Sequence, residues 1–316
     1  MQTRIANISS YRNYQDLDEV NRRVQTDPIT FVKDCEKLYL RTIDAAARSI
    51  MVSPYPFVLL AGPSGSAKTT TARCLSESLK RYGIRTHTVE LDNYFLSIDR
   101  TDPTIDWESP DRLDLPLLQK HLETLEQGGE IAIPEFDFTT SQRTGRETPL
   151  RLGRNEIAIF EGIHALNDSI IAPLKQRPLS IYVSARMRIR DETHVVFRPE
   201  WSRFLRRGLR DARFRNTPLQ DTLTRWWDVR MGEKNYIMPN KYKAQIMIDT
   251  SMDYEINLLA PLARNQVDVL DHVLLSNLRM ARLPDAVQRF IPLQPKFIPQ
   301  NSIMREFIGD LGLDEV

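Results

Sequence analysis

Apolar and polar positions alternate along the chain in a pattern that predicts short buried strands separated by helices. Five short, mostly apolar runs are strand-like, and they cover residues 57–61, 86–91, 156–161, 179–183 and 245–249. Helical spacing separates most of them, for example over 69–82, 115–127 and 200–215. Mostly apolar strands that alternate with helices are typical of parallel sheets buried on both faces. The pattern therefore predicts an α/β fold with a five-stranded parallel sheet and helices on both faces.

The segments on either side of this central pattern have a different character. The start of the chain is polar and predicts a loosely held arm, whereas Asp27 and Pro28 supply an N-cap and a first-turn proline for a helix. The predicted units are an N-terminal arm over 1–26, a leading amphipathic helix over 27–53, a main domain over 54–263 and a C-terminal helical extension over 264–316.

Prolines loosen the pattern of the main domain between residues 93 and 155. We interpret this region as an insertion that builds a substrate site. In the C-terminal extension, apolar spacing predicts one helix over 267–282. A proline-rich stretch follows, and the chain ends in a short predicted helix over 302–308.

Composition and charge exclude several classes of protein. The 316 residues carry 43 Lys plus Arg against 42 Asp plus Glu, a net charge of +1 that argues against a histone-like partner role. Two cysteines, Cys35 and Cys74, cannot build a disulfide framework, and no Cys/His spacing suggests zinc. The apolar runs are far shorter than the roughly 20 residues that span a bilayer, and the first residues have no signal-peptide core. We therefore expect a cytoplasmic protein without a membrane partner.

The strongest chemical signal is a phosphate-loop pattern between the first predicted strand and its helix. That pattern requires Gly, four residues, Gly, Lys and then Ser or Thr, and Ala67 stands where the second Gly belongs. Backbone N–H groups of such a loop wrap the phosphates of ATP, Lys68 would reach the β- and γ-phosphates, and the Thr69 hydroxyl would bind Mg²⁺. The Ala67 methyl group leaves open a catalytically impaired nucleotide binder. The expected ATP-binding loop is Gly62, Pro63, Ser64, Gly65, Ser66, Ala67, Lys68, Thr69 and Thr70.

Two acidic residues end predicted strands at the edge where ligands bind in open α/β sheets. Asp92 follows the second strand-like run, and Glu161 ends the third. Phosphoryl transfer needs a group that orients or deprotonates the acceptor hydroxyl, and it needs ligands for the metal. Asp92 and Glu161 suit these roles, although each could also cap the helix or turn that follows it.

Arginines are dense between residues 186 and 232, and we predict that this segment forms a lid. Arg203, Arg206, Arg207 and Arg210 share one broad helical face. Guanidinium groups favour a bidentate grip on phosphate, so the lid would neutralise charge that develops on ATP during transfer. The alternatives are a nucleic-acid patch, which the near-neutral charge and few interleaved aromatics disfavour, and a solvated face. In that last case the arginines would pair with Glu192, Glu200 and Asp211.

Together these motifs make the sequence similar to the uridine kinase and phosphoribulokinase family of P-loop kinases. The segments that carry the resemblance are 61–70, 91–95, 109–114, 134–138 with 143–145, 160–164, 203–215 and 232–237. The tail over 298–309 resembles one subgroup, bacterial uridine-kinase-like nucleoside kinases. That subgroup often carries an N-terminal threonyl-synthetase-like domain, which we do not expect in this chain.

The resemblance implies a kinase that uses ATP and Mg²⁺ to phosphorylate a sugar hydroxyl, usually the 5′-OH of uridine or cytidine. The implied catalytic residues are Asp92, Lys68 and Arg207, and the implied metal ligands are Thr69, Asp92 and Glu161. Arg210 and Arg215 match lid arginines that bind ATP. The implied acceptor-binding residues are Phe95, Trp107, Glu108, Phe136, Phe138 and Arg207.

Four positions depart from the pattern of the pyrimidine kinases, and one of them is the position of a His that reads the base. Phe136 replaces a Tyr, Ser141 replaces a His, Thr217 replaces a lid arginine and Arg225 replaces a glutamine. Loss of base-reading polar groups relaxes or changes specificity. The acceptor could therefore be a uridine-like or cytidine-like nucleoside, a non-pyrimidine nucleoside, a sugar or a sugar phosphate. A non-catalytic ATP-binding regulator, an RNA-binding role for the arginines and association into homo-oligomers stay open.

Overall fold

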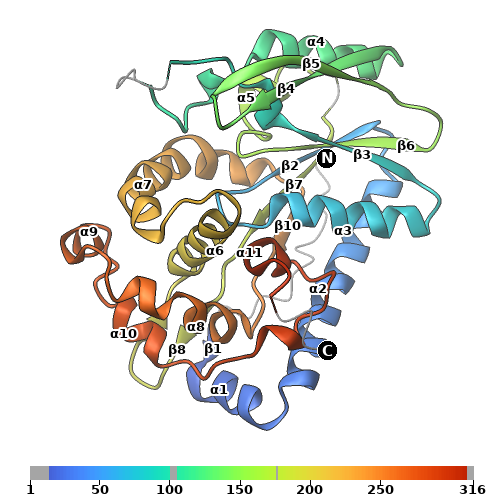
Figure 1. The fold of residues 1–316 in the computed structure, drawn as a ribbon. Coiled ribbons are helices and arrows are strands. Elements are labelled where there is room, and N and C mark those ends of the chain that lie inside the picture. Colours follow the sequence, from blue (N-terminus) through green and yellow to red (C-terminus); the bar gives the residue numbers. More distant parts are fainter. Residues whose placement is uncertain (1–13, 100–104, 176, 312–316) are drawn as a thin grey trace.

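Five parallel strands form the central sheet, in the order β10-β7-β2-β6-β3 (Figure 1). The computed structural model describes residues 14–99, 105–175 and 177–311. The strands are β2 (Phe57–Ala61), β3 (Arg85–Glu90), β6 (Glu156–Glu161), β7 (Leu179–Ser184) and β10 (Ile246–Asp249). Their bounds agree with the predicted runs to within one residue, so the predicted α/β class with a five-stranded parallel sheet is confirmed.

Strand β2 lies at the centre of the sheet, where it pairs with β6 on one side and β7 on the other. All five of its residues are buried, as expected for a strand covered on both faces. Successive side chains point to opposite faces, so Val58 and Leu60 enter one hydrophobic core while Phe57, Leu59 and Ala61 enter the other. The central position of β2 places the loop that follows it between the ends of its neighbours.

Helices cover both faces of this sheet. Helices α2 (Pro28–Met51), α3 (Lys68–Arg81), α6 (Pro199–Phe214) and α8 (Glu255–Val267) contribute to the core that contains Val58. Helix α4 (Leu115–Glu126) contributes to the opposite core. Asp27 caps α2 by accepting a hydrogen bond from the Thr30 N–H at 3.1 Å, and Pro28 occupies the first turn as predicted.

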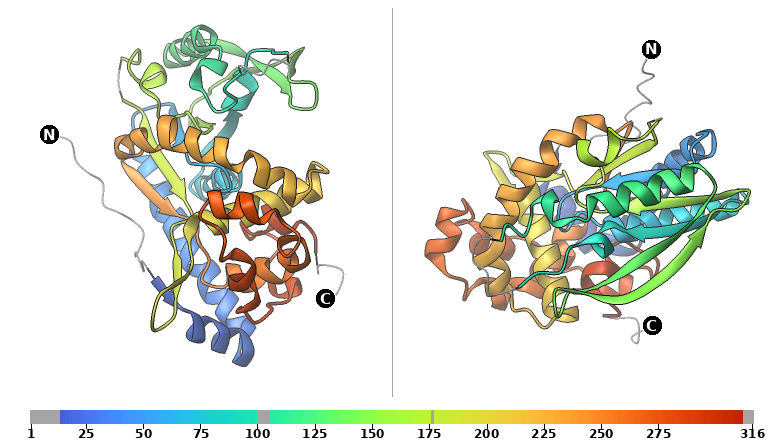
Figure 2. Two further views of the ribbon diagram at one scale, coloured as in Figure 1. Left: turned by 90° about the vertical axis from the view of Figure 1, so that its left-hand side faces the viewer. Right: turned by 90° about the horizontal axis from the view of Figure 1, so that it is seen from above.

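The insertion contains a long β-hairpin that the sequence pattern did not predict. Strands β4 (Glu130–Asp137) and β5 (Gln142–Arg151) pair antiparallel, with a register shift between Pro134 and Phe136. Pro134 and Pro149 lie inside these strands because a two-stranded ribbon has free edges, where a missing N–H costs no ladder hydrogen bond. Figures 1 and 2 show the hairpin and α4 at one end of the molecule, with α1 and α10 toward the other.

The described part of the predicted N-terminal arm is ordered secondary structure, so the prediction of a loose arm over 1–26 is wrong for residues 14–26. Strand β1 (Tyr14–Asp16) pairs with β8 (Arg188–Arg190), which also pairs with β9 (Val195–Phe197). Helix α1 (Leu17–Thr26) buries an apolar stripe that the polar composition conceals: Leu17, Val20 and Val24. Residues 1–13 lie outside the described residues.

The chain after β7 is mostly helical. Besides α6 and α8 it forms α7 (Leu219–Gly232), α9 (His272–Asn277), α10 (Leu283–Gln288) and α11 (Arg305–Ile308). The predicted helix over 267–282 is wrong, because α8 ends at Val267 and Asp271 caps a new short helix by accepting from the Val273 N–H at 2.8 Å. Of the predicted helix over 302–308, only Arg305–Ile308 is α-helical.

Shorter elements complete the fold: α5 (Asp168–Ile171), η1 (Leu91–Tyr94), η2 (Pro110–Arg112), η3 (Glu233–Ile237), η4 (Met238–Lys243) and η5 (Pro295–Phe297). Within the three described ranges, no helix is both long enough and apolar enough to cross a membrane.

Candidate active site

The phosphate loop joins the carboxyl end of β2 to α3, and its geometry requires two glycines. A Cβ on Gly62 would lie 2.3 Å from the carbonyl oxygen of Val183. Gly65 has a φ of +73°, and a Cβ there would lie 2.7 Å from the carbonyl oxygen of Arg203. The buried Ser66 hydroxyl has no hydrogen-bond partner among the described residues. An unpaired hydroxyl in a loop at a helix N-terminus fits a bound phosphate.

Ala67 adopts the conformation that glycine usually provides at this point of the loop. Its φ is 61° and its ψ is 41°, which lies in the left-handed region, and its side chain is buried. The loop thus keeps a left-handed turn despite the methyl group, at a cost in backbone strain of about 1–2 kcal/mol. The geometry preserves the entry into α3 that places Lys68 and Thr69 in its first turn.

Replacing Ala67 by Gly is expected to raise the free energy of unfolding by about 0.5–1 kcal/mol, because glycine relieves the left-handed strain. It should leave MgATP binding equal or stronger. Thermal melts with and without MgATP would measure both effects. A lower melting temperature for Ala67→Gly would show that the methyl group contributes packing that outweighs the strain.

Lys68, Asp92 and Glu161 come together around this loop. Glu161 ends β6 beside β2, and Asp92 lies in η1 just after β3, the next strand along. Thr69 Oγ1 donates a hydrogen bond to Glu161 Oε1 at 2.5 Å. Burial raises the pKa of Asp92, and it raises the pKa of Glu161 to about 7, while the positive charge of Lys68 opposes both shifts. The groups predicted to activate the nucleophile and to bind the metal are therefore both influenced by the charge of Lys68.

The donor set fits a magnesium ion that is held partly by phosphate. The described residues contain no group of three or more His, Cys, Asp or Glu side chains that could hold a metal. Mg²⁺ in kinase sites uses one or two carboxylates together with substrate phosphates and water. The Thr69 hydroxyl and the carboxylates of Asp92 and Glu161 would be the ligands that this chain supplies.

Four of the predicted acceptor residues are aromatic. The rings of Phe95, Phe136 and Phe138 meet edge to face, with centroids 5.3–6.3 Å apart. Phe95 and Phe136 are buried, whereas Phe138 and Trp107 are exposed. The Phe136 N–H donates to the side-chain oxygen of Asn93 at 3.3 Å, which ties the hairpin to the segment that carries Asp92.

Glu108 packs against the end of α7 through a glycine that the sequence did not single out as functional. A Cβ on Gly232 would lie 2.2 Å from the Cβ of Glu108, so a larger residue would displace the carboxylate. Burial raises the pKa of Glu108 to about 7, and Arg207 and Lys68 oppose that rise. The positive charges of the phosphate-loop lysine and of a lid arginine thus both act on Glu108.

Activity should depend on pH through Glu108. Because burial raises its pKa to about 7 from the usual 4.5, Glu108 loses its negative charge, and with it the predicted ability to accept hydrogen bonds from acceptor hydroxyls, as the pH falls below 7. We expect kcat/KM for the acceptor, measured at saturating MgATP, to fall about tenfold per pH unit below 7. Glu108→Gln should lower kcat/KM at pH 8 and make the fall below pH 7 shallower, while Glu161, whose pKa is also about 7, retains part of it. If kcat/KM of Glu108→Gln falls below pH 7 as steeply as that of the unmodified protein, another group causes the fall.

The three arginines predicted on the ATP and acceptor sides converge on one buried carboxylate. Asp211 lies 3.4 Å from Arg207, 2.9 Å from Arg210 and 3.5 Å from Arg215. Arg207 Nη1 also donates to the Ser64 hydroxyl at 2.9 Å, so it joins the lid helix to the phosphate loop. Asp211 therefore holds these three cations together, and Arg207 connects them to the loop.

Arg203 and Arg206 do not belong to a phosphate-facing surface, which corrects the expectation of one shared arginine face. Both are buried. Arg203 forms an ion pair with Glu233 at 2.8 Å and donates to the Ser64 carbonyl at 3.3 Å. Arg206 pairs with Glu255 and donates to the Gly65 carbonyl at 3.4 Å. They brace the outside of the phosphate loop, so the solvated-face alternative is wrong for both, and a nucleic acid could not reach them.

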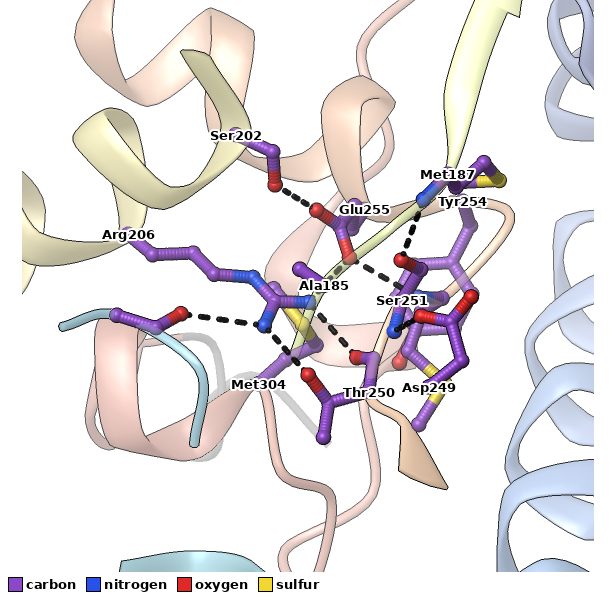
Figure 3. A network of polar contacts seen from close by, with 12 residues as sticks. Ala185, Met187, Ser202, Arg206, Asp249, Thr250, Ser251, Tyr254, Glu255 and Met304 are labelled. Atoms are coloured by element: carbon purple, nitrogen blue, oxygen red, sulfur yellow. Dashed lines mark hydrogen bonds and ion pairs between the residues drawn. The ribbon is translucent and has the colours of Figure 1, made fainter. Parts of the chain in front are cut away.

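Figure 3 shows how Arg206 connects α6 to the end of β10 and the start of α8. Its guanidinium donates to the Thr250 carbonyl at 2.8 Å, and Glu255 also accepts from the Met252 N–H at 2.9 Å and from the Ser202 hydroxyl. Next to this pair, the Ser251 hydroxyl accepts from the Met187 N–H at 3.0 Å. The network fixes the phosphate loop, the lid helix and the C-terminal helices in one arrangement.

The C-terminal segment reaches the nucleotide side of the site, which the sequence did not reveal. Thr70 Oγ1 donates to Glu306 at 2.6 Å, and Glu306 lies 3.8 Å from Arg210. The neighbouring Arg305 holds the segment in place by donating to the carbonyls of Gly309 at 3.0 Å and Leu311 at 2.7 Å. Glu306 thus contacts one residue of the loop and one of the predicted lid arginines.

These features define a P-loop kinase fold. The sheet is parallel, the phosphate loop follows its central strand, carboxylates lie at the adjacent strand ends, and arginines lie across the loop. Residues 57–257 match the model of the Phosphoribulokinase / Uridine kinase family, which is more than half of the chain. The chain belongs to this family.

Similar proteins occur among curated relatives and among solved structures. A uridine kinase of Deinococcus deserti is 30% identical over 202 residues, which cover 61% of this chain and 87% of the relative. A uridine kinase of Ureaplasma urealyticum is 26% identical over 198 residues, with 60% and 86% covered. The solved structure of a "possible uridine kinase" from Bacillus stearothermophilus aligns with a TM-score of 0.45 at 16% identity and covers 66% of this chain and 97% of that one.

Proposed function

We propose that this chain is an ATP-dependent kinase that transfers the γ-phosphate to a hydroxyl of a nucleoside or a related sugar substrate. The single observation that carries the proposal is the phosphate loop, whose Lys68 and Thr69 begin α3 beside two carboxylates at strand ends. Thr69 Oγ1 donates to Glu161 Oε1 at 2.5 Å, and Asp92 follows β3, the strand that pairs with β6. A phosphate-binding lysine among these carboxylates supports a site that holds ATP and an acceptor together.

Each group of residues has a role in this proposal. The phosphate loop binds the ATP phosphates through its backbone and Lys68, and Arg207, Arg210 and Arg215 stabilise charge that develops on the transferred group. Asp92 orients the acceptor hydroxyl and takes its proton as the new bond to phosphorus forms. A bound Mg²⁺, held by Thr69, Asp92 and Glu161, would neutralise phosphate charge.

The acceptor would lie between the aromatic group and Glu108. The rings of Phe95, Phe136 and Phe138 would contact an apolar face, Trp107 would cover it, and Glu108 would accept hydrogen bonds from sugar hydroxyls. The named relatives support a uridine-like or cytidine-like nucleoside as the first class to test. Sugars and sugar phosphates form the second class, since the polar groups that read a pyrimidine base are replaced in this sequence.

The test is a screen of ATP consumption across nucleosides, sugars and their acid or phosphate derivatives, with Mg²⁺ present. We expect at least one acceptor to raise ADP formation well above the rate without acceptor. MgATP binding by calorimetry, with no acceptor-dependent turnover in the whole panel, would refute the proposal and favour a regulatory nucleotide binder.

A further inference from the structure

Arg112 is a buried cation without a counter-ion in the described part of the chain. Its side chain lies at the end of η2, and the residue is only 8% exposed. Its Nε has no hydrogen-bond partner there, and Nη2 makes a single long contact of 3.5 Å to the carbonyl oxygen of Leu96. Burial lowers the pKa of Arg112, and no carboxylate of the described residues forms an ion pair with it. By contrast, the buried Arg203 and Arg206 of α6 each have a carboxylate partner.

Two aromatic rings hold the Arg112 guanidinium in place. Its central carbon lies 5.1 Å from the centroid of Phe95 and 5.0 Å from that of Trp107. Such cation–π contacts fix the plane of the guanidinium, but they leave the N–H groups at its edge without acceptors. Stacked arginines of this kind are well suited to bind planar carboxylates or phosphates through their edge.

The same two rings place Arg112 in the acceptor site. Phe95 follows η1, which contains Asp92, and Trp107 directly precedes Glu108. Arg112 therefore lies between the segment that supplies the expected base and the segment that supplies the expected hydroxyl-binding carboxylate. The backbone also joins these segments, because the Leu96 N–H donates to the Arg112 carbonyl at 2.7 Å.

We propose that Arg112 binds a carboxylate or phosphate group of the acceptor, so that the substrate of this site is an anionic sugar derivative. This inference rests on the proposed kinase function and narrows its acceptor. An uncompensated buried charge is costly, and a neutral base or sugar supplies no counter-charge, whereas an anionic group satisfies both the charge and the free Nε–H. The cation–π contacts alone would stabilise an arginine here without discriminating among acceptors.

The experiment compares acceptors that share a carbon skeleton and differ in charge. Ribose, ribonate and ribose 5-phosphate form one series, and glycerol, glycerate and glycerol 3-phosphate form a second. Steady-state kcat/KM is measured for each with the unmodified protein, with Arg112→Met and with Arg112→Lys. Arg154→Met is the matched control, because Arg154 is an exposed arginine of the same insertion.

We expect the unmodified protein to prefer an anionic member of a series over the neutral one by about 10- to 100-fold. Arg112→Met should lose that preference, because KM for the anionic acceptor rises far more than KM for the neutral one. Arg112→Lys should show part of the preference for the anionic acceptor, and Arg154→Met should show all of it. Whether ribonate and glycerate or the two phosphates respond identifies a carboxylate or a phosphate as the group bound.

The outcomes separate this inference from the kinase proposal. Transfer to neutral nucleosides or sugars with no preference for the anionic acceptors would overturn the role of Arg112 and leave the kinase function intact. An equal loss on neutral and anionic acceptors in Arg112→Met would also overturn it, because that result indicates a structural role. If Arg112→Met does not fold, the unmodified protein alone tests the inference. A preference for anionic acceptors supports it, and equal kcat/KM values for anionic and neutral acceptors overturn it. No transfer to any acceptor would refute the proposed function itself.

Discussion

Replacing Asp92 by Asn should lower kcat by about two to four orders of magnitude, because an amide cannot take the proton of the acceptor hydroxyl. The substitution preserves the shape of the side chain and removes only its charge and basicity. Since burial raises the pKa of Asp92, a neutral group at this position should not destabilise the fold. Initial rates with the best acceptor, together with a thermal melt, would measure both effects.

Asp285→Asn is the matched control for this experiment. Asp285 lies in α10, outside the site, and its side chain is exposed. It should keep kcat within about twofold of the unmodified protein, as surface substitutions away from special features usually do. An Asp92→Asn protein that is as active as Asp285→Asn would show that Asp92 is not the base, and the assigned mechanism would be wrong.

Removing the Arg206 cation is expected to have the largest effect on stability. Arg206 and Glu255 are both fully buried, and Arg206 also donates to the carbonyls of Gly65 and Thr250. Arg206→Met leaves the Glu255 carboxylate buried without its partner, which typically costs about 3–5 kcal/mol. Urea denaturation of the unmodified protein and the variant would measure the change in the free energy of unfolding.

A double variant distinguishes an unpaired charge from lost packing. Arg206→Met combined with Glu255→Gln removes both charges, and it should recover a large part of the lost stability. Arg213→Met on the exposed part of α6 is the control, and it should stay within about 0.5 kcal/mol of the unmodified protein. A double variant as unstable as the sum of its single variants would show that the ion pair is not the source of the effect.

The sequence predicts the nucleotide side of this molecule well because its signals are local. The strands over 57–61 and 156–161 were predicted with their observed bounds, since each is a short apolar run between polar segments. The phosphate-loop pattern predicts Lys68 and Thr69 at the start of a helix, where the structure places them. Asp92 and Glu161 end neighbouring strands, so sheet topology brings them together.

The remaining features depend on contacts between distant parts of the chain. Arg203 and Arg206 share a helical face with Arg207, but their buried partners lie 30 and 49 positions away in the sequence. The contact of Glu306 with Thr70 spans 236 positions. Nothing in the composition of these segments indicates which residues meet, and only the packed structure separates the bracing arginines from those that face the site.

The arm and the hairpin were missed for a different reason. Leu17, Val20 and Val24 are too few in a polar segment to indicate a helix by composition, although their spacing is helical. Prolines such as Pro134 argue against strands in a large sheet, and they are tolerated here because the hairpin has free edges. In both cases a weak local pattern becomes stable through packing that the sequence pattern does not show.

The central claim is that this chain transfers the γ-phosphate of ATP to a hydroxyl of a small molecule. The most direct measurement follows labelled γ-phosphate from ATP into products, with the best acceptor of the screen and with Lys68→Ala as the inactive control. The account predicts that labelled phosphoacceptor and ADP form in equal amounts, and that Lys68→Ala forms neither at a comparable rate. Label that remains in ATP, or that appears only as inorganic phosphate whichever acceptor is present, would contradict it.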